Sequence, residues 1–408
     1  MRKKALFPIF FVYFLDNFSF AVVFPLFSTL ILTTQFQFLP FYETLSQRTF
    51  MLGLLNASFP LALLIGAPIM GNLSDHYGRK KTFFITILGT IFGNIFTATS
   101  LLMQNYVLLL LSRFFCGFFS GNLSLCLAAI SDLSPNDKTR SKNFGTLTAV
   151  SGLSWVIAML AGGYLSFQTI NPDFSPPLPF WIVAAIGICN LLILVAYFPE
   201  THKVKERLNL RLSPIFHQII QAFRTHHLRP LFIVQCLFMF GWLMIFQWFS
   251  GYSVAHFGLT RNITGISLSL IGVFWIFGAT GLNRHLIKYI ALKNIPRFGL
   301  IILTILFAAS SFVPEYTILV GLDCLIALIV SFTAANLFNL ISLTARESIQ
   351  GKVLGLSQSV VTLAQFAAPV FGSMVPIQNI PLLYRISALA ALIALAIFHA
   401  EKLKPSIN

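Results

Sequence analysis

The chain has 408 residues, of which 57% are hydrophobic and 10% are Asp, Glu, Lys or Arg. A soluble domain carries roughly 25% charged residues, so this composition excludes a water-exposed globular fold and indicates a protein embedded in lipid. The formal net charge of +15 does not indicate nucleic-acid binding, because the basic residues stand in short clusters between apolar runs and form no single basic patch.

Apolar runs recur along the whole chain, and a membrane-spanning helix needs about 20 mostly apolar residues. The runs lie near 5–32, 50–73, 82–103, 106–131, 143–167, 178–198, 230–254, 262–282, 297–313, 315–340, 352–375 and 381–399. We interpret the first as an uncleaved helix, since it is too long for a signal peptide. The predicted fold is an all-α membrane protein with twelve transmembrane helices in two six-helix bundles.

The loops between these runs alternate in charge. One set is basic and contains Arg2–Lys4, Arg79–Lys81, Lys138–Lys142, Lys203–Arg229, Arg284–Arg297, Arg346–Lys352 and Lys402–Lys404, whereas the alternate loops hold Arg48, Arg261 and Arg385. Cytoplasmic loops of membrane proteins carry an excess of Lys and Arg. The pattern therefore predicts an even number of spans, with both termini cytoplasmic.

The longest polar stretch divides the chain near its middle. We predict an N-terminal six-helix bundle over 1–198, a central cytoplasmic loop over 199–229 and a C-terminal six-helix bundle over 230–408. The halves match at one constant offset, which pairs Gly71 with Gly281 and Gly162 with Gly372. Parallel repeats of this kind place a site near the bilayer midplane, between halves that rock to give alternating access.

A polar segment joins the second and third runs and reads Gly71-Asn-Leu-Ser-Asp75-His-Tyr-Gly78-Arg79-Lys80-Lys81. We expect Gly71 to permit close helix approach and Gly78 to permit a tight turn. Asp75 and Arg79 are spaced for charge-assisted hydrogen bonds, which could latch the two bundles in one state and release them in the other. The alternative is a short basic loop without a role in gating.

Three charged side chains lie inside apolar runs. A charge at the bilayer centre costs about 2.5 kcal/mol or more, so we expect Asp16 to face a cavity and exchange a proton; orienting helices near one mouth is the alternative. Arg113 cannot lose its proton and needs a partner or water. Asp323 occupies the position that matches Arg113 in the second half. It is either a second titrating site or a structural group near the membrane edge.

Several of these motifs resemble those of a known protein family. The segment from Gly71 to Lys81 resembles the signature loop of the major facilitator superfamily at every defined position. Leu15-Asp16, with Pro25 nine residues on, is similar to the first helix of the tetracycline-efflux-like drug:proton antiporters. Arg113, followed by Gly117 and Gly121, resembles the R-x-x-x-G pattern of that branch. Pro199-Glu200-Thr201 is also family-like, so the resemblance covers essentially the whole chain.

The resemblance implies roles for further residues. Asp132 is expected to complete a charge relay with Arg79 and Asp75, with interfacial solvation as the alternative. Arg113 is expected to be linked to proton transfer, with packing or contact with a substrate anion as the alternative. Helices 1, 7 and 11 line the central cavity in this family, so the substrate-binding candidates are Asn17, Gln235, Trp242, Gln247 and Gln365, with Trp248 beside them. The competing interpretations are interhelical hydrogen bonding for the amides and a lipid-facing aromatic belt for the tryptophans.

One element departs from the efflux branch. That branch usually carries G-P-x-x-G-G in helix 5, whereas this chain reads Ala158-Met159-Leu160-Ala161-Gly162-Gly163. The glycine pair is present and the Gly-Pro is not, which leaves the direction of transport open.

No motif indicates an enzyme, a cofactor or a metal site. The chain has no G-x-x-x-x-G-K-[ST] and no H-E-x-x-H, and its five cysteines stand in apolar runs without C-x-x-C spacing. We predict a monomeric proton-coupled transporter of the bacterial inner membrane that exports a small organic solute by proton antiport. The alternatives are proton symport of a nutrient or metal-chelator complex, and a non-transporting sensor or scaffold.

Overall fold

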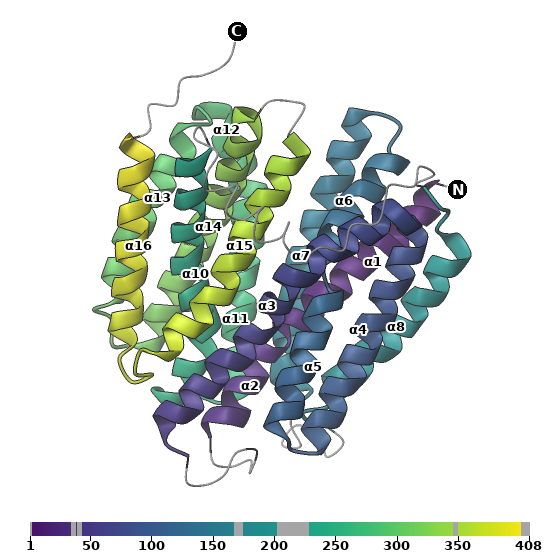
Figure 1. The fold of residues 1–408 in the computed structure, drawn as a ribbon. Helices are drawn as coiled ribbons and strands as arrows, with labels where there is room; N and C mark the ends of the chain where they lie inside the picture. The colour runs from purple at the N-terminus through teal and green to yellow at the C-terminus, as the bar shows by residue number, and fades with distance from the viewer. Residues whose placement is uncertain are drawn as a thin grey trace. The chain divides into compact units, whose positions relative to one another are not determined.

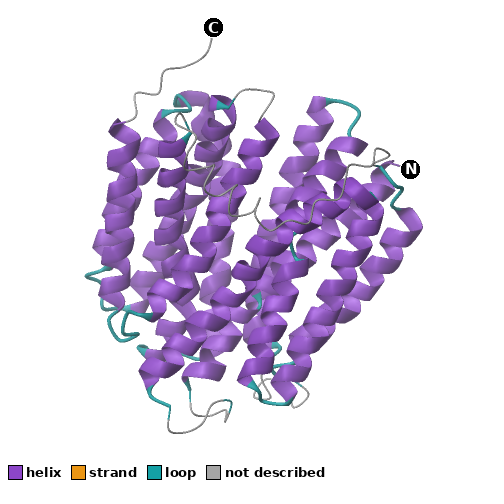
Figure 2. Cartoon of the chain, in the orientation of Figure 1, coloured by secondary structure: helices purple, strands orange, loops and turns teal. Residues whose placement is uncertain are grey.

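The computed structural model describes residues 2–33, 38, 43–166, 174–201, 228–345 and 350–400. Within these ranges all regular elements are helices (Figures 1 and 2). Those of the first half are α1 (Arg2–Ala21), α2 (Val23–Leu32), α3 (Leu45–Tyr77), α4 (Arg79–Leu102), α5 (Tyr106–Phe119), α6 (Asn122–Leu133), α7 (Asp137–Tyr164) and α8 (Leu178–Tyr197). Most of the predicted central loop and the basic residues Lys402 and Lys404 lie outside the described residues.

The second half contains a comparable series. Its helices are α10 (Arg229–Ala255), α11 (Arg261–Phe277), the π-helix η1 (Gly278–Leu282), α12 (Asn283–Tyr289), α13 (Asn294–Ser310), α14 (Tyr316–Thr344), α15 (Gln350–Ser373) and α16 (Ile380–Ala400). Gly281 and Arg284, the counterparts of the signature loop, therefore lie within a helical segment that runs from α11 through η1 into α12. Asn336 of α14 donates a side-chain hydrogen bond to Asn283 there.

Among the residues that the structure describes, eleven helical segments are long and apolar enough to cross a membrane. Two of them join successive helices across a short break, at Ala5–Leu32 and Tyr106–Leu133, and a third, Asn262–Tyr289, runs through the π-helix η1. The predicted run near 297–313 forms α13, which has 17 residues and is shorter than the roughly 20 that a span requires. The twelfth span and the side on which the termini lie therefore stay predictions.

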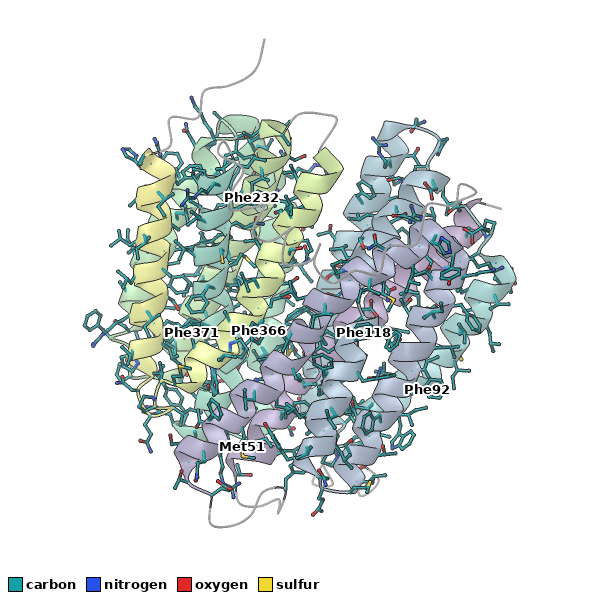
Figure 3. All side chains as sticks on the ribbon, viewed as in Figure 1. Met51, Phe92, Phe118, Phe232, Phe366 and Phe371 are labelled. Carbon is teal, nitrogen blue, oxygen red and sulfur yellow. The ribbon has the colours of Figure 1, made fainter. Side chains whose placement is uncertain are left out.

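Exposed aromatic side chains support the membrane assignment. Phe92 on α4 is 58% exposed and Phe371 on α15 is 57% exposed, whereas Phe232 on α10 is fully buried (Figure 3). Many further large apolar residues, from Phe7 to Ile393, are likewise exposed. Soluble proteins rarely expose so much contiguous apolar surface, and hydrocarbon solvates it. The chain is a multi-pass integral membrane protein.

The chain folds into two compact units. Unit 1 comprises Met1–Thr44, Leu54–Leu212 and Thr260–Ser269, and unit 2 comprises Leu45–Gly53, Ser213–Leu259 and Leu270–Asn408. Both α3 and α11 thus contribute residues to each unit. The domain boundaries that the sequence suggested at 198 and 230 stay predictions.

In unit 1, α1 packs against α6, α7 and α8, and α4 packs against α5 and α8. The first span breaks at Val22, between α1 and α2. Pro25 explains this break, because it has no N–H to donate to the carbonyl group of Ala21. Gly162 of α7 lies against the break, and a Cβ atom there would collide with the carbonyl oxygen of Val22 and the ring of Pro25. The retained glycine therefore allows α7 to approach the broken first span closely.

In unit 2, α10 packs against α15 and α16, and α13 packs against α14 and α16. Gly278, the first residue of η1, packs on Leu328 and Ser331 of α14, where a Cβ atom would have no room. The middle of α10 consists largely of buried residues and the first turns of α14 contain several, so both reach the interior of the unit.

Candidate functional site

Asp16 lies inside unit 1, where α1 brings it against α6. Its side chain is buried, and Asn122 Nδ2 donates a hydrogen bond of 2.8 Å to its Oδ2 atom. No basic residue forms an ion pair with Asp16 among the described residues. The structure therefore buries Asp16 and gives it an amide partner that the sequence did not identify, and its role in proton exchange stays a prediction.

Arg113 of α5 is buried in an aromatic environment. Its Nη2 atom donates a hydrogen bond of 2.8 Å to the backbone oxygen of Ser19, and its guanidinium carbon lies 4.9 Å from the ring centroid of Phe59 and 5.9 Å from that of Phe180. Within the described part of the chain, Nη1 has no hydrogen-bond partner and no carboxylate pairs with the cation. Arg113 is thus held to α1 by one hydrogen bond and by cation–π contacts.

Asp16 and the backbone oxygen of Ser19 that binds Arg113 lie on the same helix, α1, about one turn apart. Residues 16 and 19 lie on one face of α1, because helical residues three apart are neighbours. The Ser19 hydroxyl group also contacts the side-chain amide of Asn94 on α4, 3.1 Å from Nδ2. One face of α1 therefore carries the acid, the backbone oxygen that holds Arg113 and a buried polar contact to α4.

Asn17 faces α7. Its Oδ1 atom accepts hydrogen bonds of 2.9 Å from Ser151 Oγ and from Trp155 Nε1, and its Nδ2 atom donates to the backbone oxygen of Tyr13 at 2.7 Å. Both atoms of the amide are therefore engaged. These bonds match the interhelical alternative, and they compete with the predicted substrate contact.

The signature loop forms the predicted set of charge contacts. Arg79 Nη1 lies 2.8 Å from Asp75 Oδ1, and Arg79 Nε lies 3.6 Å from Asp132 Oδ2. Thr201 Oγ1, just after α8, donates a hydrogen bond of 3.0 Å to Asp132 Oδ2. The helix ends of α3, α4 and α6 and the segment after α8 thus converge on Arg79.

Gly78 makes the predicted tight turn between α3 and α4. Its φ of 96° and ψ of 161° lie in a backbone region that is essentially restricted to glycine, and a side chain there would collide with the Glu200 carboxylate. That carboxylate accepts hydrogen bonds from the backbone N–H groups of Arg79 at 2.8 Å and Lys80 at 3.2 Å. A carboxylate at a helix N-terminus satisfies free donors and complements the helix dipole.

Lys80 and Gly71 of the signature loop differ in their contacts. Lys80 Nζ donates a hydrogen bond of 2.9 Å to the backbone oxygen of Val195 on α8. At Gly71 the prediction of close helix approach was wrong for the described residues, because no heavy atom of theirs lies within 4 Å of the position that a Cβ atom would take.

The substrate-binding candidates of unit 2 lie on α10 and α15. Gln235 Oε1 accepts a hydrogen bond of 2.7 Å from Ser357 Oγ, and Gln247 Nε2 donates one of 3.2 Å to the backbone oxygen of Gln365. Trp242 and Trp248 are 6% and 1% exposed, so the alternative of a lipid-facing belt was wrong. Both side chains point into the protein.

Three neighbouring buried side chains of α10 carry polar atoms that the described residues leave without hydrogen bonds. These atoms are Gln247 Oε1, Trp248 Nε1 and Ser250 Oγ. Gly372 of α15 lies directly against the Trp248 indole, and a Cβ atom there would overlap the ring. Buried polar atoms are normally hydrogen-bonded, so these groups are candidates for contact with a bound solute.

Asp323 of α14 is buried, and its carboxyl oxygens lie within hydrogen-bond distance of the hydroxyl groups of Tyr252 and Tyr384. The sequence placed Asp323 among the candidates through its match to Arg113. The tyrosines were missed, because a Tyr in an apolar run carries no signal of its partner and both come from distant helices.

Comparisons with known proteins point to one family. A family model described as Major Facilitator Superfamily matches residues 9–403. The chain is 30% identical over 236 residues to the class H tetracycline resistance protein of Pasteurella multocida, covering 55% of this chain and 54% of that protein. It is 26% identical over 258 residues to a bicyclomycin resistance protein homolog of Haemophilus influenzae, covering 60% and 59%. The alignments therefore span little more than half the length of these relatives.

A solved structure shares the whole fold. It is that of a bacterial homolog of the human lysosomal transporter Spinster, with a TM-score of 0.76 and 15% sequence identity, covering 98% of this chain and 96% of that one. At this level of identity the likeness concerns the fold alone.

Proposed function

The chain belongs to the Major Facilitator Superfamily, and on this premise we propose that it is a proton-coupled secondary active transporter that exports a small organic solute by proton antiport. One aligned relative is a tetracycline resistance protein and another is a bicyclomycin resistance protein homolog, which supports export of a drug-like molecule. These relatives are bacterial, so the bacterial cytoplasmic membrane is the proposed location.

The burial and the hydrogen bonding of Asp16 are the observation that carries the proposal. Its carboxyl group is buried, has an amide as its hydrogen-bond donor and lacks an ion-pair partner among the described residues. A carboxylate in such a place is disfavoured by the loss of water, and protonation removes the penalty. Asp16 would take up a proton when its site opens to the acidic side and release it when the site opens to the other side.

Arg113 would connect this proton to the movement of α1. Its guanidinium group holds the backbone of Ser19, one turn from Asp16, and it keeps its charge throughout. Loss of the Asp16 proton creates a negative charge on the same helix face, which favours a changed arrangement of Arg113 and α1. The coupling is reciprocal, because proton and solute must change each other's affinity.

The contacts around Arg79 are the proposed gate. Arg79 joins Asp75 and Asp132 at the ends of three helices, and Gly78, Lys80 and Glu200 keep the start of α4 in place. Such charge contacts are reversible, because the side chains are partially exposed and can replace their contacts with each other by contacts with water. They would form in one state of the transport cycle and separate in another.

The proposed solute contacts lie on α10 and α15. Gln247 and Trp248 present one acceptor and one donor that no described residue uses, which suits a solute with hydroxyl or amide groups and an apolar body. Gln365, whose backbone oxygen accepts from Gln247, and Trp242 would lie nearest to these groups, and Gln235 lies about three turns away along α10. Asn17 remains a candidate on α1, although its amide is engaged with α7 in this structure.

Everted membrane vesicles with an acidic interior test the proposal. Addition of tetracycline or bicyclomycin should release protons, reported by a pH-sensitive dye, and Asp16→Asn should abolish this release. Glu315→Gln, at the exposed residue before α14, is the matched control and should behave as wild type. An unaltered response in Asp16→Asn would refute Asp16 as the coupling acid. Solute entry accompanied by protons moving in the same direction would establish symport instead.

A further inference from the structure

Three side chains from three helices of unit 2 meet in one buried cluster, and the carboxyl group of Asp323 lies at its centre. Tyr384 of α16 places its hydroxyl oxygen 2.9 Å from Oδ1 and 2.8 Å from Oδ2 of Asp323, and the Tyr252 hydroxyl oxygen of α10 lies 3.2 Å from Oδ2. The two tyrosine oxygens lie 2.9 Å apart. Asp323 is 1% exposed and both tyrosines are 0% exposed. We call these residues the Asp323 triad.

Counting protons distinguishes the two charge states of this triad. Its three side chains form three pairwise contacts, in which the Tyr384 hydroxyl group is shared between both carboxyl oxygens, and a hydrogen bond requires one proton between its two heavy atoms. The two neutral tyrosines supply two protons, so an ionised Asp323 leaves one contact as a pair of facing lone pairs. A protonated Asp323 supplies the third proton, and the hydrogen bonds then close into a ring. A closed ring of hydrogen bonds among the three groups therefore requires the protonated carboxyl group.

The surroundings also favour the neutral form. On α14 the nearby titratable groups are Tyr316 and Cys324, which carry no charge when protonated. On the elements that pack against α14, the charged residues stand elsewhere: Arg385 of α16 is exposed and lies 5.6 Å from the Phe312 ring centroid, and His256, at the end of α10, is exposed. Arg284, His285 and Lys288 of α12, Arg297 of α13 and Lys352 of α15 belong to the opposite end of the antiparallel helices. No described cation pairs with Asp323.

We propose that the Asp323 triad is a proton-binding site of unit 2, present here with its proton bound and separate from Asp16 in unit 1. Tyr252 and Tyr384 are its positioning residues, since they hold the carboxyl group and accept or donate hydrogen bonds in either charge state. The matching position of the first half holds Arg113, so the repeat carries a fixed cation in one unit and an exchangeable proton in the other. The proton site stands on the geometry, whereas its use in transport rests on the proposed function.

Infrared difference spectroscopy on the purified full-length protein tests the site without a transported solute. Between acidic and alkaline buffer, the wild type should lose the carbonyl stretch of a protonated carboxylic acid, a band that shifts in heavy water. Asp323→Asn should remove one such band that Asp16→Asn retains. A dye-based count of protons released on alkalinisation should fall by about one in each variant and by about two in the double variant.

The tyrosines provide a second test with little change in packing. Tyr252→Phe and Tyr384→Phe should each move the Asp323 band to higher frequency, since a carbonyl group with fewer hydrogen bonds vibrates faster. Tyr289→Phe, at an exposed position of the same unit, should leave it in place. The proposal would be overturned if Asp323→Asn left both the band and the proton count unchanged. If Asp323→Asn does not fold, a band that neither tyrosine variant moves would overturn it. Asp16→Asn flux in vesicles decides the proposed function independently.

Discussion

Asn122 Nδ2 lies 2.8 Å from Asp16 Oδ2, and this contact joins α6 to α1 inside unit 1. A hydrogen bond to a charged group contributes roughly 1.5–3 kcal/mol, and here it favours the ionised form of Asp16. Replacing the donor therefore makes release of the proton harder.

Asn122→Leu is expected to lower proton-driven transport about tenfold near neutral pH, as 1.4 kcal/mol corresponds to a factor of ten in an equilibrium constant. Transport should recover when the side that receives the proton is made more alkaline. The control is Asn190→Leu, a buried amide of α8 for which the described residues provide no hydrogen-bond partner. Vesicle flux at several pH values is the measurement, and equal loss in both variants would contradict the role of Asn122.

Gly78→Ala should damage the signature loop, whereas Gly71→Ala should not. The backbone of Gly78 has a φ of 96° and its Cβ position is filled by Glu200, so alanine should destabilise the protein by about 1–3 kcal/mol. Gly71 lies inside α3 with open space at its Cβ position, and alanine there should stabilise the helix by about 0.5–1 kcal/mol. Thermal unfolding in detergent compares the two, and a reversed order would refute this account of the loop.

Arg113→Met should separate function from stability. A buried cation without an ion-pair partner is expensive to fold, and an apolar side chain of similar length in its place is often neutral or stabilising. We expect an unfolding temperature equal to or above that of the wild type, with proton-driven flux reduced at least about tenfold. Arg113→Lys keeps the charge but loses the planar fork that reaches Ser19, and it should also transport poorly. A clear drop in stability with normal flux in Arg113→Met would show that Arg113 serves packing.

Trp248→Phe should alter solute binding and leave the fold intact. The indole N–H group of Trp248 donates to no described residue, so phenylalanine removes no hydrogen bond of the protein. Tetracycline or bicyclomycin should raise the unfolding temperature of the wild type, because a ligand that binds the folded state stabilises it, and the rise should be smaller in Trp248→Phe. Gln235→Leu is the contrasting variant, since it removes the bond to Ser357 and should destabilise the protein without solute. Identical solute-induced shifts in wild type and Trp248→Phe would remove Trp248 from the site.

Most contacts that the sequence predicted join residues that are close together in the chain or that belong to a family motif. Asp75 and Arg79 are four residues apart on neighbouring turns, so their ion pair follows from helix geometry alone. The contact from Arg79 to Asp132 was accessible through the family pattern. Glu200, by contrast, reaches the start of α4 from 121 residues away, and no local pattern identifies it as the group that caps that helix.

Local chemistry accounts for what the amino-acid sequence determined by itself: the helical class, the membrane environment, the basic loops and the presence of ionisable groups inside apolar runs. Each of these depends on the transfer of a residue and its near neighbours between water and hydrocarbon. The tertiary structure alone decided which partners those groups have. Asn122 for Asp16, the aromatic rings around Arg113 and the two tyrosines around Asp323 are set by the faces on which distant helices pack, and packing depends on the whole set of side chains at each crossing.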